Sequence, residues 1–476
     1  MPPNAVHEWT VLARANELVF QDFEPPVRLG FFAQTFAARR LEDVWSIIPE
    51  GVIGRHPSVP TQRVFSHWAV RGGTQWTPQR LTWVAAMMAW DEGQTLDSRW
   101  EHARQVAGGL HIHWALGTSY SGFAAALVRQ SPRIVAGIKT KFRQAMLAMG
   151  SRHQTRCGWR AFAVDGSRIE APLTQANEGG LGCAGRKKSG PQVFVTTLWH
   201  MGLGLPWDFR VGPGADGERR HLEQMLDELP QGSLIVADAG FVGYELCQRV
   251  LNAGQSFLLC VGGNIRLLTD LGWEHEQREG LLYLWPLKHR HLPPAVLRLI
   301  VLRRDKQEIF LPTNVFDPQQ LSDTDAGVLY EMRWSVEVFY RSYKQTLHRR
   351  RLLSRMPATC LTECSWTMLG PWLLGLPTVS RIAAKKQAPL SWSVALARNA
   401  VRRAIRVGIC GGQGGRLFRD LASAVKDAYK RRGPKAARDY PRKKHEKPPG
   451  PPEIQSASPK EIQRAKRLRE KISTAA

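Results

Sequence analysis

The sequence lacks an apolar run long enough to cross a membrane. A membrane-spanning helix needs roughly 18 or more consecutive apolar residues. The best candidate, Trp366 to Leu376, is shorter and is interrupted by Pro371, so we expect a buried helix there. A signal peptide is not recognisable either, because charged residues are scattered through residues 1–20. These absences favour a protein of the cytoplasm.

Cysteine is scarce and poorly spaced for bridges or metal sites. The seven cysteines are scattered and odd in number, which does not suit a disulfide framework. Cys360 and Cys364 stand four residues apart, yet no second pair of Cys or His residues completes the spacing of a zinc site. We therefore expect free thiols in a reducing compartment and no structural zinc.

Acidic residues are few relative to basic ones. The 476-residue chain has 41 Asp and Glu against 66 Lys and Arg, a formal charge of +25. A charge of that size favours a polyanionic partner, and nucleic acid and an anionic membrane surface are the two candidates. It argues against an enzyme for small neutral substrates, which would leave the charge unexplained. With 43% hydrophobic residues, the chain can build two or three folded domains.

Changes in composition divide the chain into four regions. Residues 1–155 predict a helical, basic domain, which we interpret as DNA-binding, although a helical cap would have the same pattern. Residues 156–355 predict a catalytic α/β domain with a β-rich insertion at about 262–313, and residues 356–429 predict further helices. Residues 430–476 contain 15 Lys and Arg, 5 Asp and Glu and seven prolines, which is typical of a disordered tail that holds a polyanion.

Residues 156–261 alternate between strand and helix patterns. The order is strand, strand, strand, helix, strand, helix, strand, which indicates a mixed α/β core. The expected strands are 161–164, 192–199, 206–211, 233–237 and 257–261, and the expected helices are about 221–228 and 244–253. Within the insertion, residues 281–284 and 296–303 predict short strands.

Two aspartates follow strands of this core. Asp165 comes after the apolar run 161–164, and Asp238 comes after 233–237. Strand ends at a sheet edge are where α/β proteins build sites. An Asp next to Gly after a strand is also a common turn, so each residue alone is a weak signal.

A helical pattern near residue 337 carries the third carboxylate. Tyr330, Arg333, Glu337 and Lys344 are spaced by three, four and seven, which places them on one face of a regular helix. The simplest interpretation is a solvated helix in which Arg333 and Glu337 form a weak ion pair. The alternative is a face that combines one metal-binding acid with cations for phosphate.

Three motifs together resemble a known family. Val164-Asp165-Gly166, Ala237-Asp238-Ala239-Gly240 and the Tyr-x2-Arg-x3-Glu-x6-Lys pattern occur in this order. In them the chain resembles DDE transposases of the bacterial insertion-sequence-four type over residues 155–350. The resemblance implies a ribonuclease H-like catalytic core, with Asp165, Asp238 and Glu337 as catalytic ligands of two Mg²⁺ ions, which Mn²⁺ can replace. Carboxylates suit these hard cations.

The resemblance also implies partners and further contacts. The enzyme would cut double-stranded DNA at the element's ends and join them to target DNA, acting as a homodimer near the bacterial nucleoid. Trp273 and Trp285 in the insertion are candidates for stacking on a flipped base, although both are tryptophans of a kind often found in a core. The candidate DNA-binding residues are Tyr330, Arg333, Lys344, Arg341, Arg168, Lys187, Lys188 and Arg210.

Two other functions use the same residues. A nuclease could cleave DNA without joining strands, and an inactive descendant of a transposase could bind DNA without cleaving it. The presence of all three acids and of the cations argues against the inactive form.

Overall fold

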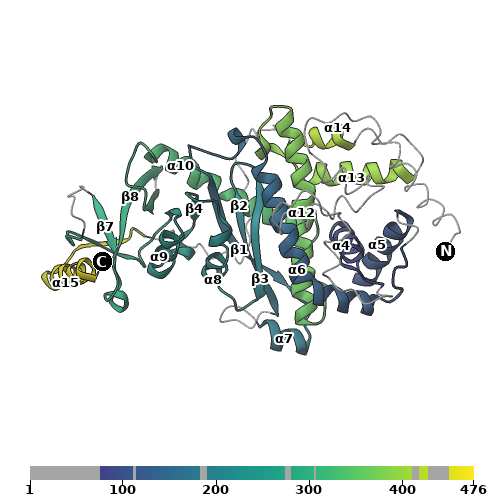
Figure 1. Ribbon diagram of the computed structural model, residues 1–476, viewed down its shortest axis with the longest axis horizontal. Helices are drawn as coiled ribbons and strands as arrows, with labels where there is room; N and C mark the ends of the chain where they lie inside the picture. Colours follow the sequence, from purple (N-terminus) through teal and green to yellow (C-terminus); the bar gives the residue numbers. More distant parts are fainter. Residues whose placement is uncertain are drawn as a thin grey trace.

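The computed structural model describes residues 75–110, 114–182, 190–273, 280–304, 307–409, 417–426 and 450–475. These residues form an elongated molecule, with a mixed sheet in the centre, helices at one end and a β-rich part with a terminal helix at the other (Figure 1). The expected mixed α/β class with helical regions before and after the core is confirmed. The expected domain boundaries remain predictions.

In the described part of the chain, ten strands form one sheet in the order β10-β6-β7-β8-β9-β5-β4-β1-β2-β3. Strand β1 is antiparallel to β2 and parallel to β4, and β4 is parallel to β5. This arrangement agrees with the ribonuclease H-like core implied by the resemblance. The core strands are β1 (Ala161–Glu170), β2 (Gln192–His200), β3 (Leu205–Pro213), β4 (Leu234–Ala237) and β5 (Ser256–Leu259).

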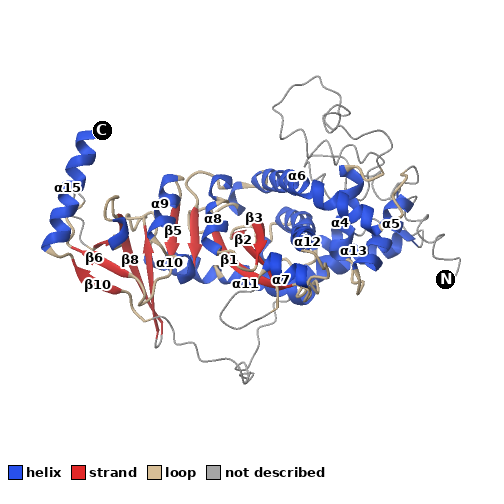
Figure 2. Cartoon of the chain, turned by 90° about the horizontal axis from the view of Figure 1, so that it is seen from below, coloured by secondary structure: helices blue, strands red, loops and turns tan. Residues whose placement is uncertain are grey.

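Helices cover both faces of this core. The pairs are α8 (Glu218–Glu223) with α9 (Tyr244–Asn252), and α10 (Asp323–Met332) with α11 (Trp334–Arg341). Thr196 of β2 bonds a side chain of α8, whereas its neighbour Thr197 bonds a side chain of α11. Because successive strand residues point to opposite faces, α8 and α11 lie on opposite sides of the sheet (Figure 2).

The helical end packs beside strand β3. Helix α12 (Pro357–Ala384) runs next to α6 (Tyr120–Leu147), and residues 366–379 of α12 are almost all buried, as expected for a buried helix. Among the described residues, no helix is long and apolar enough to span a membrane. The other helices here are α4 (Pro78–Trp90), α5 (Leu96–Leu110), α7 (Gln175–Leu181), α13 (Val394–Ile409) and α14 (Leu417–Ala422).

The β-rich insertion continues the core sheet rather than forming a separate one. Strand β9 pairs with β5 through Leu258 and Thr313, and the remaining insertion strands follow in antiparallel order. Strand β10 then adds in parallel to the outer edge of β6. These strands are β6 (Arg266–Thr269), β7 (Leu281–Leu284), β8 (Ala295–Arg304), β9 (Gln307–Thr313) and β10 (Glu453–Ser456).

The expectation of a disordered tail is wrong for residues 450–475. This segment contains β10 and helix α15 (Pro459–Ala475), which pack on the insertion. Ser458 and Glu461 exchange hydrogen bonds as a capping box, and the Glu461 carboxylate also pairs with Arg290 of the insertion. Overall composition indicated disorder, but the local pattern of Ser458, Pro459 and Glu461 is typical of a helix start. Residues 427–449 lie outside the described residues.

Candidate active site

Asp165 and Asp238 lie side by side on neighbouring strands. The parallel register pairs Ala163 with Val236, so two residues later it brings Asp165 level with Asp238. The expectation that the first strand ends at Val164 is wrong, because β1 stays paired with β2 as far as Glu170. Asp165 lies just past the point where β1 loses its pairing with β4, so its carboxylate is at the sheet edge without ending a strand.

Each aspartate is held by a backbone N–H from its own motif. Oδ1 of Asp165 accepts from Gly166 at 2.9 Å, and Oδ1 of Asp238 accepts from Gly240 at 2.9 Å. Among the described residues, no donor bonds the Oδ2 atom of either side chain. One oxygen of each carboxylate therefore remains free for a ligand.

The Tyr330–Lys344 segment is not one regular helix, which corrects the expectation from spacing. Helix α10 ends before Arg333, α11 follows, and residues 342–346 form a π-helical turn closed by the N–H of Leu347 on the carbonyl of Ser342. A π turn takes up an extra residue, so it changes the direction of Lys344 relative to a regular helix.

Tyr340 fixes α11 against the strand that carries Asp165. Its hydroxyl lies 3.1 Å from the carbonyl oxygen of Asp165, 3.1 Å from that of Val195 and 2.8 Å from Oγ1 of Thr197. Glu337 lies one helical turn before Tyr340. The structure thus brings Glu337 into electrostatic contact with both Asp165 and Asp238.

Two of the three carboxylates, those of Asp165 and Glu337, have raised pKa values. Burial raises the pKa of Asp165 to about 7; the N–H of Gly166 opposes that rise, and the charges of Asp238 and Glu337 add to it. Burial also raises the pKa of Glu337, while the guanidinium of Arg333 lowers it. A divalent cation between the carboxylates would relieve this repulsion.

The acids suit Mg²⁺ ions that take one or two protein carboxylates each, rather than an ion held entirely by protein ligands. Within the described residues, no three His, Cys, Asp or Glu side chains are grouped closely enough to hold a metal ion by themselves. Mg²⁺ is usually bound by one or two carboxylates, with waters and substrate phosphates as its other ligands. The free oxygens of Asp165 and Asp238, and the carboxylate of Glu337, match that demand.

The expected cations of the signature lie around Glu337. Nη2 of Arg333 is 3.3 Å from Oε1 of Glu337, and its guanidinium lies over the ring of Tyr330 at 5.5 Å. Arg341 is exposed on α11 and close enough to Glu337 to lower its pKa. Burial and Arg350 lower the pKa of the half-buried Lys344, whereas Asp165 and Glu170 raise it. The segment therefore keeps cations next to the acids despite its breaks.

The more distant candidates have different surroundings. Arg168 is exposed on β1 and stacks over Phe194 at 4.8 Å. Arg210 lies 3.4 Å from Oδ2 of the buried Asp208 and also bonds the carbonyl of Gln224, so its charge is already engaged. Lys187 and Lys188 lie outside the described residues.

The two tryptophan candidates differ in exposure. Trp285 is only 2% exposed, and its Nε1 donates to the carbonyl of Leu292 at 2.8 Å, so its ring is not available to a base. The stacking prediction for Trp285 is therefore wrong, since the ring fills the core of the insertion. Trp273 is half-buried against that core, and its role remains a prediction.

Sequence reasoning missed a fourth carboxylate, Glu218, at the start of α8. A Cβ on Gly166 would lie 2.5 Å from its Oε1, and one on Gly240 would lie 3.4 Å from its Oε2. Burial raises the pKa of Glu218, Asp238 raises it further, and Arg168 and Arg219 lower it. The available signal was an acidic residue in the first turn of the helix after the third strand, which is weak because acids are common in first turns.

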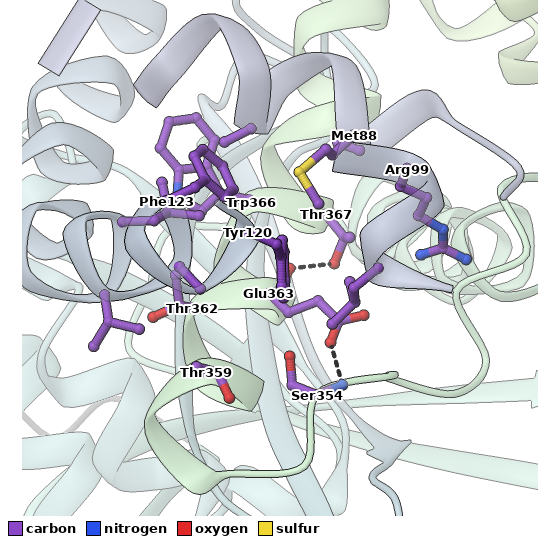
Figure 3. A pocket seen from close by; sticks show the side chains of 16 residues that line it. Met88, Arg99, Tyr120, Phe123, Ser354, Thr359, Thr362, Glu363, Trp366 and Thr367 are labelled. Atoms are coloured by element: carbon purple, nitrogen blue, oxygen red, sulfur yellow. Dashed lines mark hydrogen bonds between the residues drawn. The ribbon is translucent and has the colours of Figure 1, made fainter. Parts of the chain in front are cut away.

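Two hollows in the described residues lie apart from the carboxylates. A cleft of about 390 Å³ is lined by Trp334 and Trp392, next to faces of α11 that do not carry Glu337. A cavity of about 50 Å³ lies between α4, α6 and α12 (Figure 3). There the half-buried Glu363 accepts N–H bonds from Leu353 and Ser354, so it fixes the chain that follows the signature.

Comparison with known proteins agrees with this core. Residues 158–365 match the transposase DDE domain family. The transposase InsG for insertion sequence element IS4 of Escherichia coli (strain K12) is 25% identical over 223 residues, which cover 44% of this chain and 50% of that protein. The putative transposase for insertion sequence element IS4SA of Synechocystis sp. is 21% identical over 169 residues, which cover 34% and 47%. The chain thus spans about half the length of these relatives.

A solved structure is similar in outline. It is the piggyBac transposase synaptic complex with hairpin DNA, with a TM-score of 0.39 and 9% sequence identity over 90% of this chain and 88% of that one. The domain match and both relatives agree with the motifs and with the mixed sheet. In the residues that these comparisons cover, the chain is similar to DDE transposases of the insertion-sequence-four type.

Proposed function

We propose that the protein is a divalent-cation-dependent DNA transposase that cuts an insertion sequence at its terminal inverted repeats and joins it to target DNA. The observation that carries this proposal is the convergence of Asp165, Asp238 and Glu337 at one edge of the sheet. A solvated helix would not need the buried Tyr340 anchor that holds Glu337 there.

In the proposed reaction, water attacks the phosphodiester at the element's end and the bond to the 3′-oxygen breaks. The released 3′-hydroxyl then attacks a target phosphodiester, forming a new P–O bond and displacing the target's 3′-oxygen. Each attacking hydroxyl gives its proton to solvent. Mg²⁺ bound at the three acids would activate the attacking oxygen and stabilise the leaving one.

The chain's own residues have three tasks in this scheme. Asp165, Asp238 and Glu337 hold the cations, and Tyr340 keeps the two elements that carry these acids in register. Arg333 and Lys344 bind phosphate oxygens of the DNA end, since cations beside a phosphodiester position it without reading its sequence. Two ends must be cut and joined, so we propose that a homodimer acts on DNA in the bacterial cytoplasm.

Cleavage of linear DNA that carries the element's own terminal repeats, in Mg²⁺, tests the proposal. We expect wild type to cut at the repeat boundary and Glu337→Gln to bind the DNA without cutting it. Glu178→Gln removes an exposed acid from the first turn of α7 and serves as the control. Cleavage that survives Glu337→Gln would show that the acid assignment is wrong.

The two alternatives give different results in the same assay. Wild type that binds but never cuts would be the inactive DNA-binding form. Wild type that cuts but yields no joined product with added target DNA would be a nuclease.

A further inference from the structure

The chain that follows Glu337 carries an excess of positive charge. Residues 338–362 include six Lys or Arg and no Asp or Glu. Arg341 and Lys344 lie beside the acids, and Arg349 is buried. The other three are exposed at the surface, and we call them the basic ridge. The basic ridge consists of Arg350, Arg351 and Arg355.

The backbone that carries the basic ridge is held in place by contacts with three other elements. Nη2 of the buried Arg349 donates to three carbonyl oxygens at the C-terminal end of α4, at 2.7–3.0 Å. The N–H of Leu352 donates to the last residue of β1 at 2.8 Å, and the next two N–H groups donate to the carboxylate of Glu363. The carbonyl oxygen of Arg355 accepts from Oγ1 of Thr174 at 2.9 Å, just before α7. The ridge side chains therefore extend from a fixed backbone, which loses little freedom when they bind a partner.

The basic ridge begins close to the acids. Glu170 comes five residues after Asp165 on β1, a distance of about 17 Å at 3.4 Å per residue. Nε of Arg350 lies 4.0 Å from Oε1 of Glu170. Burial and then the charge of Arg350 lower the pKa of Lys344, so the ridge adjoins the cations of the site. One turn of B-DNA is about 34 Å long, so phosphates within a turn of a bond held at the acids can reach the ridge.

The cations of the ridge are poorly neutralised within the protein. The side chain of Arg350 is 80% exposed, and its contact with Glu170 is at the outer limit for an ion pair. Neither Arg351 nor Arg355 forms an ion pair with another residue that the structure describes. Planar guanidinium groups match the oxygens of a phosphate, which makes Arg a preferred residue for binding phosphates. The ridge is thus a fixed row of phosphate-binding groups whose charge is free for an external anion.

We propose that the basic ridge binds the phosphate backbone of double-stranded DNA beside the bond on which the acids act. The inference rests on the proposed function, because it extends the DNA path of the same site. DNA is favoured over an anionic membrane surface, because the ridge adjoins carboxylates that suit phosphodiester chemistry. Phosphate contacts position a duplex without reading its bases. The ridge therefore adds affinity for DNA of any sequence and fixes the direction in which the duplex leaves the acids.

The salt dependence of DNA binding by the full chain tests the proposal. The probe is a linear duplex that contains the element's terminal repeat and its flanking DNA, kept uncut by a chelator. Each phosphate contact contributes about 0.9 to the slope of log affinity against log salt concentration, so Arg351→Gln with Arg355→Gln should lower its magnitude by about 2. The matched control is Lys385→Gln with Lys386→Gln, which removes two exposed cations at the other end of α12, about 40 Å away. We expect the control to keep the wild-type slope.

Hydroxyl-radical footprinting of the same complexes locates the contact. The Gln variant of the ridge should lose protection in one block within about 10 base pairs of the cleavage point, which is one helical turn. The control should keep that block. Arg351→Lys with Arg355→Lys keeps both charges and should restore the slope and the block, because Lys also binds phosphate as a point charge.

The outcomes separate this inference from the proposed function. If wild type does not bind the duplex, both are refuted. If wild type binds and cuts the DNA while the Gln variant of the ridge keeps the slope of the control, only the ridge is refuted. Equal losses in the variant and the control, or protection lost far from the cleavage point, would also overturn the inference. A Lys variant that binds as poorly as the Gln variant would show that the ridge does not act through its charge.

Discussion

Replacing Asp165 with Asn should stabilise the protein when no divalent cation is present. Asn has the same shape, and its side-chain oxygen can still accept the N–H of Gly166. It removes a charge that is half-buried beside Asp238 and Glu337. Catalytic sites often contain such unfavourable charges, which their ligands relieve.

The pKa of Asp165 gives the size and sign of the effect. Its rise from the ordinary 3.8 to about 7 corresponds to an upper bound of roughly 4 kcal/mol. A carboxyl with a raised folded-state pKa retains its proton in the folded state after the unfolded chain has lost it. Stability from this group is therefore present below about pH 4 and is lost as pH rises to about 7. The advantage of Asn should grow across that window and level off above it.

Thermal and urea unfolding in a chelator, at steps from pH 4 to pH 8.5, measure this difference. We expect Asp165→Asn to have the higher unfolding midpoint at pH 8, and the gap to narrow towards pH 4. Added Mn²⁺ should raise the midpoint of wild type more than that of the variant, because only wild type keeps the charge that binds it. A variant less stable than wild type at pH 8 in chelator, or a gap independent of pH, would refute the reasoning.

Three further changes test other parts of the structure. Tyr340→Phe should lower the free energy of unfolding by about 1–3 kcal/mol, because the helix that carries Glu337 loses its hydrogen bonds to β1 and β2. The rate of DNA cleavage should fall by a larger factor than the affinity for DNA. Equal losses in the two quantities would contradict the anchoring role. Glu363→Gln should lower the free energy of unfolding by a similar amount, since the half-buried carboxylate accepts the N–H groups of Leu353 and Ser354. An unchanged unfolding midpoint would contradict that role. Helix α15 carries an exposed stripe of four basic residues, and replacing all four with Gln should weaken the salt dependence of DNA binding. The slope of log affinity against log salt concentration should fall in magnitude by up to about 3–4. An unchanged slope would show that α15 is not part of the DNA-binding surface. The stripe consists of Lys460, Arg464, Arg467 and Lys471.

Much of the core fold follows from local pattern. The buried strand at 234–237 and the helix at 244–252 are close to their predicted bounds, because a run of apolar residues between turn residues leaves few alternatives. The continuation of β1 through Asp165 and Gly166 was not predictable in this way. It depends on pairing with β2, a contact between distant parts of the chain.

The three acids of the candidate site could be predicted from the sequence, whereas the residues that pack against them and hold them in place could not. Asp165, Asp238 and Glu337 stand in motifs with ordered spacing, so their meeting could be inferred. Glu218 has no motif, and its position follows only from the packing of α8 against two glycines. Tyr340 was equally hidden, because a tyrosine in an amphipathic helix is normally a core residue.

The parallel pairing of β10 with β6 has a consequence for synthesis of the protein. Strand β6 belongs to the insertion, whereas β10 comes from residues 453–456. The outer edge of β6 therefore stays open on the ribosome until translation has passed Ser456. Open strand edges pair readily with other chains. Chains whose translation ends before this point should therefore fold their core but leave β6 as an unpaired edge strand. Such chains should aggregate, or be bound by chaperones and degraded by proteases, before they bind DNA.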